Sequence, residues 1–129
     1  MSGTIDFVYD VDNDIVVATP HWKINTQADV LEWFGQYQAY MRRFDRKMDF
    51  IVILDDFELG PGIGVLWGEY RARVHNLYTR FNFRVHSSSR VKLFVNTSGV
   101  RYNVSTEEAH SVEDAILGIK ELRKTLKPA

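Results

Sequence analysis

The stretch Asp49-Phe50-Ile51-Val52-Ile53-Leu54-Asp55-Asp56 decides the fold. It places five consecutive apolar residues between carboxylates, which is typical of a β-strand covered on both faces. Strands of this kind lie inside parallel sheets, with helices packed against each side. The sequence therefore predicts that residues 50–54 form the central strand of an α/β domain.

Amphipathic helices are predicted on both sides of this strand. Before it, residues 30–44 carry apolar side chains in steps of three and four, and Thr26 followed by Asp29 has the pattern of a helix N-cap. After it, residues 63–81 carry the strongest helical stripe in the chain, which ends on Phe81. Four residues of this stripe are expected to be buried: Ile63, Tyr70, Val74 and Leu77.

Further elements are predicted toward the two ends of the chain. Residues 5–9 and 15–19 favour a β-hairpin, because apolar side chains alternate around a turn that is rich in aspartate. Residues 90–95 predict another strand, and residues 100–104 a short edge strand. A last helix is expected to begin near Ser111.

Together these elements predict an α/β fold. Its sheet is mixed and mostly parallel, with four to five strands, an opening β-hairpin and three main helices. The chain has 129 residues, a length that fits one hydrophobic core. We therefore expect residues 1–129 to form a single domain.

Composition narrows the classes of function. The absence of cysteine excludes disulfides and thiol chemistry. A net charge of −1 disfavours a role in binding nucleic acid or an anionic membrane. The first residues do not resemble a secretory signal, and no apolar run approaches the ~20 residues of a membrane span, so we expect a cytoplasmic protein.

Positive charge is nevertheless concentrated in the second half of the chain. We expect these side chains to form a solvated helical face, since charged residues are rarely buried. The basic residues of the predicted second helix and its exit are Arg71, Arg73, His75, Arg80, Arg84, His86 and Arg90.

No catalytic or metal-binding motif stands out. The four histidines lack the close spacing of metal ligands, and no Gly-x-Ser-x-Gly motif is present, so we expect no metal, no cofactor and no enzymatic activity. Asp55, Asp56 and Glu58 follow the central strand, where open α/β sheets often bind ligands. They are the best acid/base candidates, although a hydrated acidic loop is the favoured interpretation.

One segment carries a family resemblance. Leu59-Gly60-Pro61-Gly62-Ile63-Gly64-Val65-Leu66-Trp67-Gly68-Glu69-Tyr70-Arg71 resembles the signature of STAS domains, the bacterial anti-sigma-factor antagonists, and their SpoIIAA-like relatives. The order of predicted elements is similar to that family over nearly the whole chain. The resemblance implies a regulatory module that binds a protein partner.

The same segment departs from the family at its regulatory position. Family members carry there a serine that a kinase phosphorylates, and this chain has Pro61. Proline has no hydroxyl group, so the resemblance implies a binding module without the usual phosphoswitch. Proline suits the first turn of a helix, where its missing N–H has no partner to lose.

Two functional hypotheses remain open. The first is a non-enzymatic module that docks a protein partner, or a second copy of itself, through the strand-to-helix turn. Its predicted contact residues are Leu59, Gly60, Pro61, Gly62, Gly64 and Trp67. The alternative is a carrier of a small apolar ligand or lipid, with a pocket between helices and sheet. The predicted pocket residues are Trp22, Trp33, Tyr37, Trp67 and Tyr70.

Overall fold

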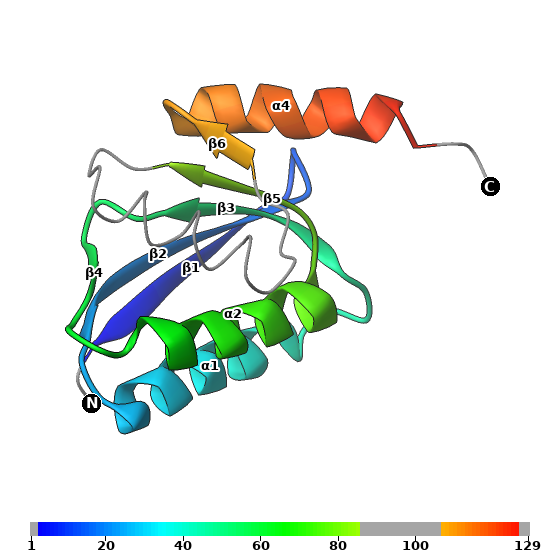
Figure 1. Cartoon of the computed structure of the whole chain (residues 1–129). Helices are drawn as coiled ribbons and strands as arrows, with labels where there is room; N and C mark the ends of the chain where they lie inside the picture. Colours follow the sequence, from blue (N-terminus) through cyan, green and yellow to red (C-terminus); the bar gives the residue numbers. More distant parts are fainter. Residues whose placement is uncertain (1–2, 86–106, 127–129) are drawn as a thin grey trace.

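The chain folds into three layers, with a twisted β-sheet between helices (Figure 1). The computed structural model describes residues 3–85 and 107–126. The strands predicted over residues 90–95 and 100–104 lie outside these described residues. The α/β class is confirmed, with a sheet that is mostly parallel after an antiparallel opening hairpin.

Six strands form the sheet in the part of the chain that the structure describes. In chain order they are β1 (Thr4–Asp10), β2 (Ile15–Ile24), β3 (Met48–Ile53), β4 (Phe57–Leu59), β5 (Thr79–Val85) and β6 (Glu107–Ala109). Their spatial order is β1-β2-β3-β5-β6, and β4 pairs with the far end of β2. The prediction of a central strand at residues 50–54 is therefore confirmed by β3.

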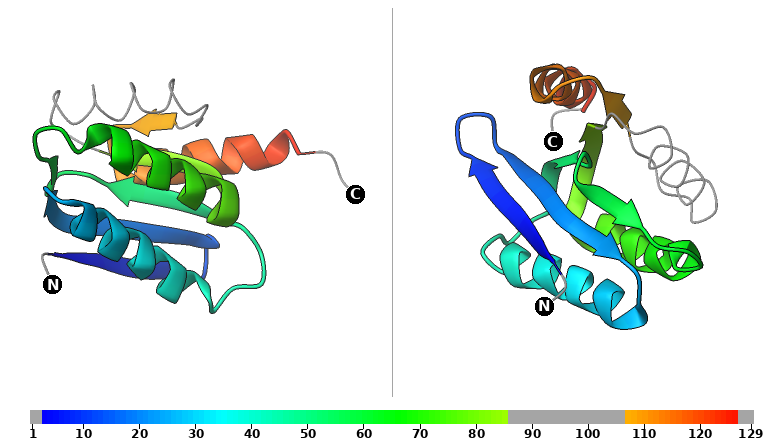
Figure 2. Two further views of the ribbon diagram at one scale, coloured as in Figure 1. Left: turned by 60° about the horizontal axis from the view of Figure 1, so that its bottom comes forward. Right: turned by 90° about the vertical axis from the view of Figure 1, so that its left-hand side faces the viewer.

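Within the described residues, three helices cover the two faces of the sheet (Figure 2). They are α1 (Gln27–Met41), α2 (Gly64–Tyr78) and α4 (Val112–Lys124). Helices α1 and α2 lie side by side on one face, and α4 covers the other. Both predicted helix starts are confirmed by N-caps: Thr26 accepts from the backbone N–H of Asp29, and Ser111 accepts from that of Asp114.

Helix α2 is shorter than its apolar stripe predicts. It ends at Tyr78, and the chain becomes extended at Thr79, so that Phe81 lies in strand β5. Residues 80–85 alternate between polar and apolar side chains, which is the period of a strand. The prediction that Leu77 is buried is also wrong, because this residue is 55% exposed on the outer face of the helix.

The sheet separates two apolar clusters. The larger joins α1 and α2 to the sheet, and Phe50 lies at its centre with no exposed surface. The smaller joins α4 to the opposite face through Ile51, Phe83 and Ile119. Phe50 and Ile51 are neighbours that point to opposite faces, as alternation along a strand requires. Both faces of β3 are thus covered.

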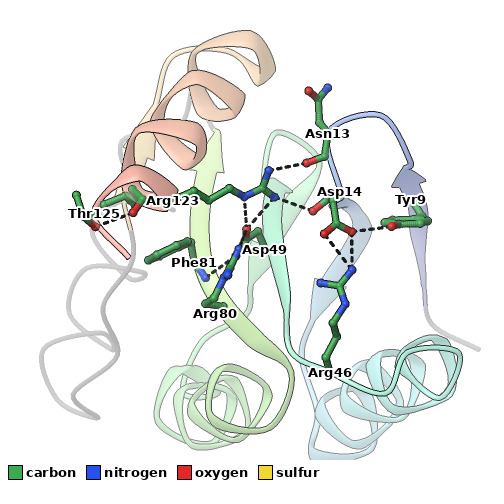
Figure 3. A network of polar contacts seen from close by, with 10 residues as sticks. Tyr9, Asn13, Asp14, Arg46, Asp49, Arg80, Phe81, Arg123 and Thr125 are labelled. Carbon is green, nitrogen blue, oxygen red and sulfur yellow. Dashed lines mark hydrogen bonds and ion pairs between the residues drawn. The ribbon is translucent and has the colours of Figure 1, made fainter. Parts of the chain in front are cut away.

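An ionic network centred on one buried carboxylate fastens α4 to the sheet (Figure 3). The carboxylate of Asp49, at the start of β3, accepts hydrogen bonds of 2.8 Å from Nε of Arg80 and from Nε of Arg123. Arg123 also donates to the backbone carbonyls of Asn13 and Asp14, both at 2.8 Å. These contacts, which we call the Asp49 clamp, tie α4 to the β1–β2 turn.

Candidate functional site

The turn that resembles the STAS motif lies between β4 and α2, and much of it is internal. Leu59 and Trp67, two of the predicted contact residues, are 8% and 3% exposed, so they offer little surface to a partner. Gly60 is buried as well, and its N–H donates to the carbonyl of Ile24 at 2.7 Å. A side chain at Gly60 would overlap that of Asn25. This glycine therefore serves close packing of the backbone.

Only the tip of the turn reaches the surface. Pro61 and Gly62 are exposed, and Gly64, the first residue of α2, is partly buried. Gly62 has a φ of 77°, a conformation that glycine adopts without steric cost. No atom lies within 4 Å of a Cβ built at this position. Partner binding by this tip stays a prediction.

The acidic loop after β3 contacts His21, a residue that was not predicted at this site from the sequence. Asp56 contacts Nδ1 of His21 at 2.7 Å, and Asp6 contacts Nε2 at 2.9 Å. The hydrogen bond with Asp56 is the largest cause that raises the pKa of His21 above its ordinary value. Asp55 and Glu58 line the same shallow, exposed hollow, which we call the His21 hollow.

A cavity of about 40 Å³ lies between α1, α2 and the sheet. By the same measure a single water needs roughly 10–15 Å³, so the space accommodates a small molecule. We call it the α2 cavity. Its lining residues are Pro20, Trp33, Tyr37, Val52, Leu54, Phe57, Trp67, Arg71, Val74, His75, Asn82 and Arg84.

Three of the five predicted pocket residues meet at the α2 cavity. Trp33 and Tyr37 reach it from α1, and Trp67 reaches it from α2. Trp22 instead lines the His21 hollow. Tyr70 does not line the cavity and packs edge-on against Phe34 of α1, with ring centres 5.2 Å apart.

Polar side chains from two elements face this apolar wall. Asn82 and Arg84 alternate along β5 with Phe83, which points to the opposite face. Helix α2 covers them and adds Arg71 and His75. The expectation of a solvated basic face is wrong at Arg71 and Arg84, which are 5% and 7% exposed.

The cavity wall is positively charged. Burial, together with the charge of Arg84, lowers the pKa of Arg71 to about 10. Both guanidinium groups remain protonated at neutral pH. Arg84 lies 3.9 Å from Glu108 at the sheet edge, and Arg71 lies over the Trp67 ring, 5.6 Å from its centre. Among the described residues, no carboxylate lines the cavity.

His75 is held neutral inside this charged surrounding. Burial, reinforced by the charges of Arg71 and Arg84, lowers its pKa to about 3. Its Nε2 lies 3.3 Å from Nδ2 of Asn82, and its Nδ1 lies 3.4 Å from the hydroxyl of Thr79. The Thr79 hydroxyl donates to the His75 carbonyl at 3.1 Å, so Nδ1 carries the proton and Nε2 accepts from Asn82. This pairing fixes the tautomer.

One donor on the wall lacks an acceptor within the described part of the chain. The indole N–H of Trp67 is buried and makes no hydrogen bond there. A buried donor without an acceptor costs roughly 1–3 kcal/mol. A ligand oxygen in the cavity is one group that would satisfy it.

A charged cavity wall was not predicted from the sequence, because the polar residues of that wall come from two different elements, α2 and β5. Arg71 and His75 are four positions apart, which places them on one helical face. The Asn82-Phe83-Arg84-Val85 alternation was the available signal for polar side chains on one face of a strand. Nothing in the local pattern indicates that α2 covers that face.

Over residues 3–85 and 107–126, no cluster of three metal-ligating side chains occurs. None of the described helices has the length and apolar character needed to cross a membrane. Comparison of the sequence with protein-family models and with curated proteins gave no match.

Proposed function

We propose that this chain is a non-enzymatic binding domain that holds a small molecule in the α2 cavity. The observation that carries the proposal is the composition of the wall, where eight apolar side chains meet a few convergent polar groups. Ligand sites in proteins typically combine these two features. A cytoplasmic setting, expected from the sequence, is part of the same proposal.

The titration of His75 supports binding over catalysis. A general acid or base works best when its pKa lies near the working pH. The pKa of His75 is about 3, so this imidazole is a poor proton carrier at neutral pH. The other polar side chains of the wall are two arginines and an asparagine, which do not exchange protons there.

Filling the cavity tests the proposal. The probes are acetate, propionate, butyrate, propionamide and propanol, each titrated into isotope-labelled protein while backbone and indole N–H signals are followed by NMR. We expect at least one probe to shift the Trp33 and Trp67 signals in a saturable way. The Val74→Phe variant should abolish these shifts, because Val74 lines the cavity and a phenyl ring occupies its volume.

Val65→Phe is the matched control, because Val65 lies on the same helix and is exposed. It should leave the shifts unchanged. If no probe shifts the lining residues, or if the shifts survive in Val74→Phe, the proposal fails.

Docking of a protein partner at the turn is a second candidate function. It is consistent with the proposed resemblance of this segment to STAS domains. The open space around Gly62 favours it. Gly62→Arg should reduce self-association or partner capture measured by sedimentation and pull-down. Gly62→Asn is the control, since asparagine tolerates a positive φ and adds little bulk. Equal association of both variants and the parent would contradict docking at this tip.

A further inference from the structure

We infer that the ligand of the α2 cavity is a short-chain carboxylate, whose oxygens contact Arg71 and Arg84 and whose tail contacts the aromatic wall. This inference rests on the proposed function, because it names the class of molecule for the same cavity. Three features support this inference: the charge of the cavity wall, the polarity of that wall and the size of the cavity.

Charge comes first. Arg71 and Arg84 lie close enough for the charge of one to lower the pKa of the other. Both repel a proton on His75 as well. Two like charges in a space of low polarity destabilise each other, and an anion between them removes this repulsion. Both arginines keep contacts within the protein, and the ligand adds to these.

The donors are suited to a planar oxyanion. A guanidinium group presents N–H groups in a fork that matches a carboxylate. The buried indole N–H of Trp67 supplies a further donor without an acceptor in the described part of the chain. Arg71 lies over the ring of the same tryptophan.

Size and polarity select the rest of the molecule. A space of about 40 Å³ holds only a few non-hydrogen atoms. Phe57, Leu54 and Val52 offer that space an apolar wall, which a hydrocarbon tail would cover. Inorganic phosphate has no apolar part and carries more charge into the cavity. The wall therefore favours a small acid such as propionate over phosphate.

The decisive comparison uses the parent protein and two probes of nearly equal shape. Propionate and propionamide differ in charge, and both are titrated while the Trp67 indole N–H is followed by NMR. Charge-assisted hydrogen bonds are about twice as strong as neutral ones. We expect propionate to bind on the order of tenfold tighter than propionamide, which equals about 1.4 kcal/mol.

Two variants locate the charge. Arg71→Met should remove most of the preference for propionate, because it deletes one guanidinium group from the wall. Arg73→Met removes the same charge from an exposed position on the same helix and should leave the preference within about twofold of the parent. If Arg71→Met does not fold, the comparison of the two probes on the parent still decides.

Each outcome separates the inference from the proposed function. Equal binding of propionate and propionamide would overturn the inference that the ligand is a carboxylate. It would not contradict the proposal that the cavity binds a small molecule. Inorganic phosphate is titrated in the same way as a third probe. If it binds as tightly as propionate and loses that binding in Arg71→Met, the cavity is an anion site of another class and the inference is overturned. The absence of binding by every probe would overturn both.

Discussion

The fold lowers the pKa of His75 and raises the pKa of His21. Each shift makes the free energy of unfolding depend on pH in a different range. The pKa of His75 is lowered from an ordinary 6.5 to about 3 by burial and by two arginines. The unfolded chain therefore binds a proton that the folded chain excludes. Stability is lost as the pH falls from about 6.5 toward 3, with a slope of up to about 1.4 kcal/mol per pH unit.

We expect His75→Gln to flatten this acid slope in urea unfolding measured across the pH range. His21→Gln is the informative companion, because the pKa of His21 is raised by Asp56 and Asp6. Its stabilising contribution is complete below pH 6.5 and is lost as the pH rises through the higher folded value. An acid slope unchanged in His75→Gln would show that the imidazole titrates freely.

Substitution by alanine should change the stability of the fold in opposite directions at two helical glycines, Gly35 and Gly118. A Cβ at Gly35 in α1 meets no atom within 4 Å, so Gly35→Ala should stabilise the fold by up to about 1 kcal/mol through helix propensity. A Cβ at Gly118 in α4 would lie 2.5 Å from the ring of Phe83, which is itself buried. Crowding of this kind costs ~1–3 kcal/mol.

Gly118→Ala should therefore destabilise the protein, and chemical denaturation of both variants measures the difference. Stabilisation by both substitutions to the same extent would show that α4 moves away from the sheet without cost.

Polar contacts of Arg123 add to the apolar packing that holds α4 on the sheet. Arg123 is one of two arginines on the buried Asp49 carboxylate, and it is partly exposed itself. Burial alone would raise the pKa of Asp49, but hydrogen bonds from Arg80 and Arg123 outweigh it and lower that pKa. Removing one donor leaves the carboxylate with a weaker set of partners in the interior.

We expect Arg123→Met to cost about 1–3 kcal/mol in urea unfolding, the usual range for hydrogen bonds to a charged group. Lys124→Met removes a charge from the next position, which pairs with the exposed Glu121, and should change stability by less than about 0.5 kcal/mol. Equal effects of the two substitutions would show that the Asp49 clamp contributes nothing.

Local signals in the sequence were enough for most elements. The capping residues Thr26 and Ser111 marked helix starts correctly because a cap is made by neighbours in the chain. The end of α2 was misplaced, because Phe81 follows Tyr78 at helical spacing while also belonging to a strand alternation. Two periods overlap at these residues, and only tertiary packing decides between them.

The candidate site was less predictable than the elements, because it exists only once the whole molecule has assembled. Trp33 and Trp67 could be named as pocket residues, since large aromatics on facing helices meet over a sheet. Arg71 and Arg84 could not, because a charged residue is expected at the surface unless its surroundings are known. Their burial depends on how α2 lies across β5.

The three tryptophans predict how the whole molecule unfolds. They lie in β2, α1 and α2, and each is at most 4% exposed. Their fluorescence should shift to longer wavelength on unfolding, while circular dichroism also reports α4, which has no tryptophan. We expect coincident transitions, as for a two-state domain. An earlier loss of helical signal would mean that α4 detaches while the rest stays folded.

The position of Arg123 has a consequence for the order in which the nascent chain acquires structure. Its carbonyl partners, Asn13 and Asp14, lie 110 and 109 residues earlier in the sequence. The opening hairpin therefore leaves the ribosome long before the arginine that anchors its turn. Until α4 is synthesised, Ile51 and Phe83 present an uncovered apolar face of the sheet. During that interval the growing chain is most exposed to aggregation and to capture by chaperones.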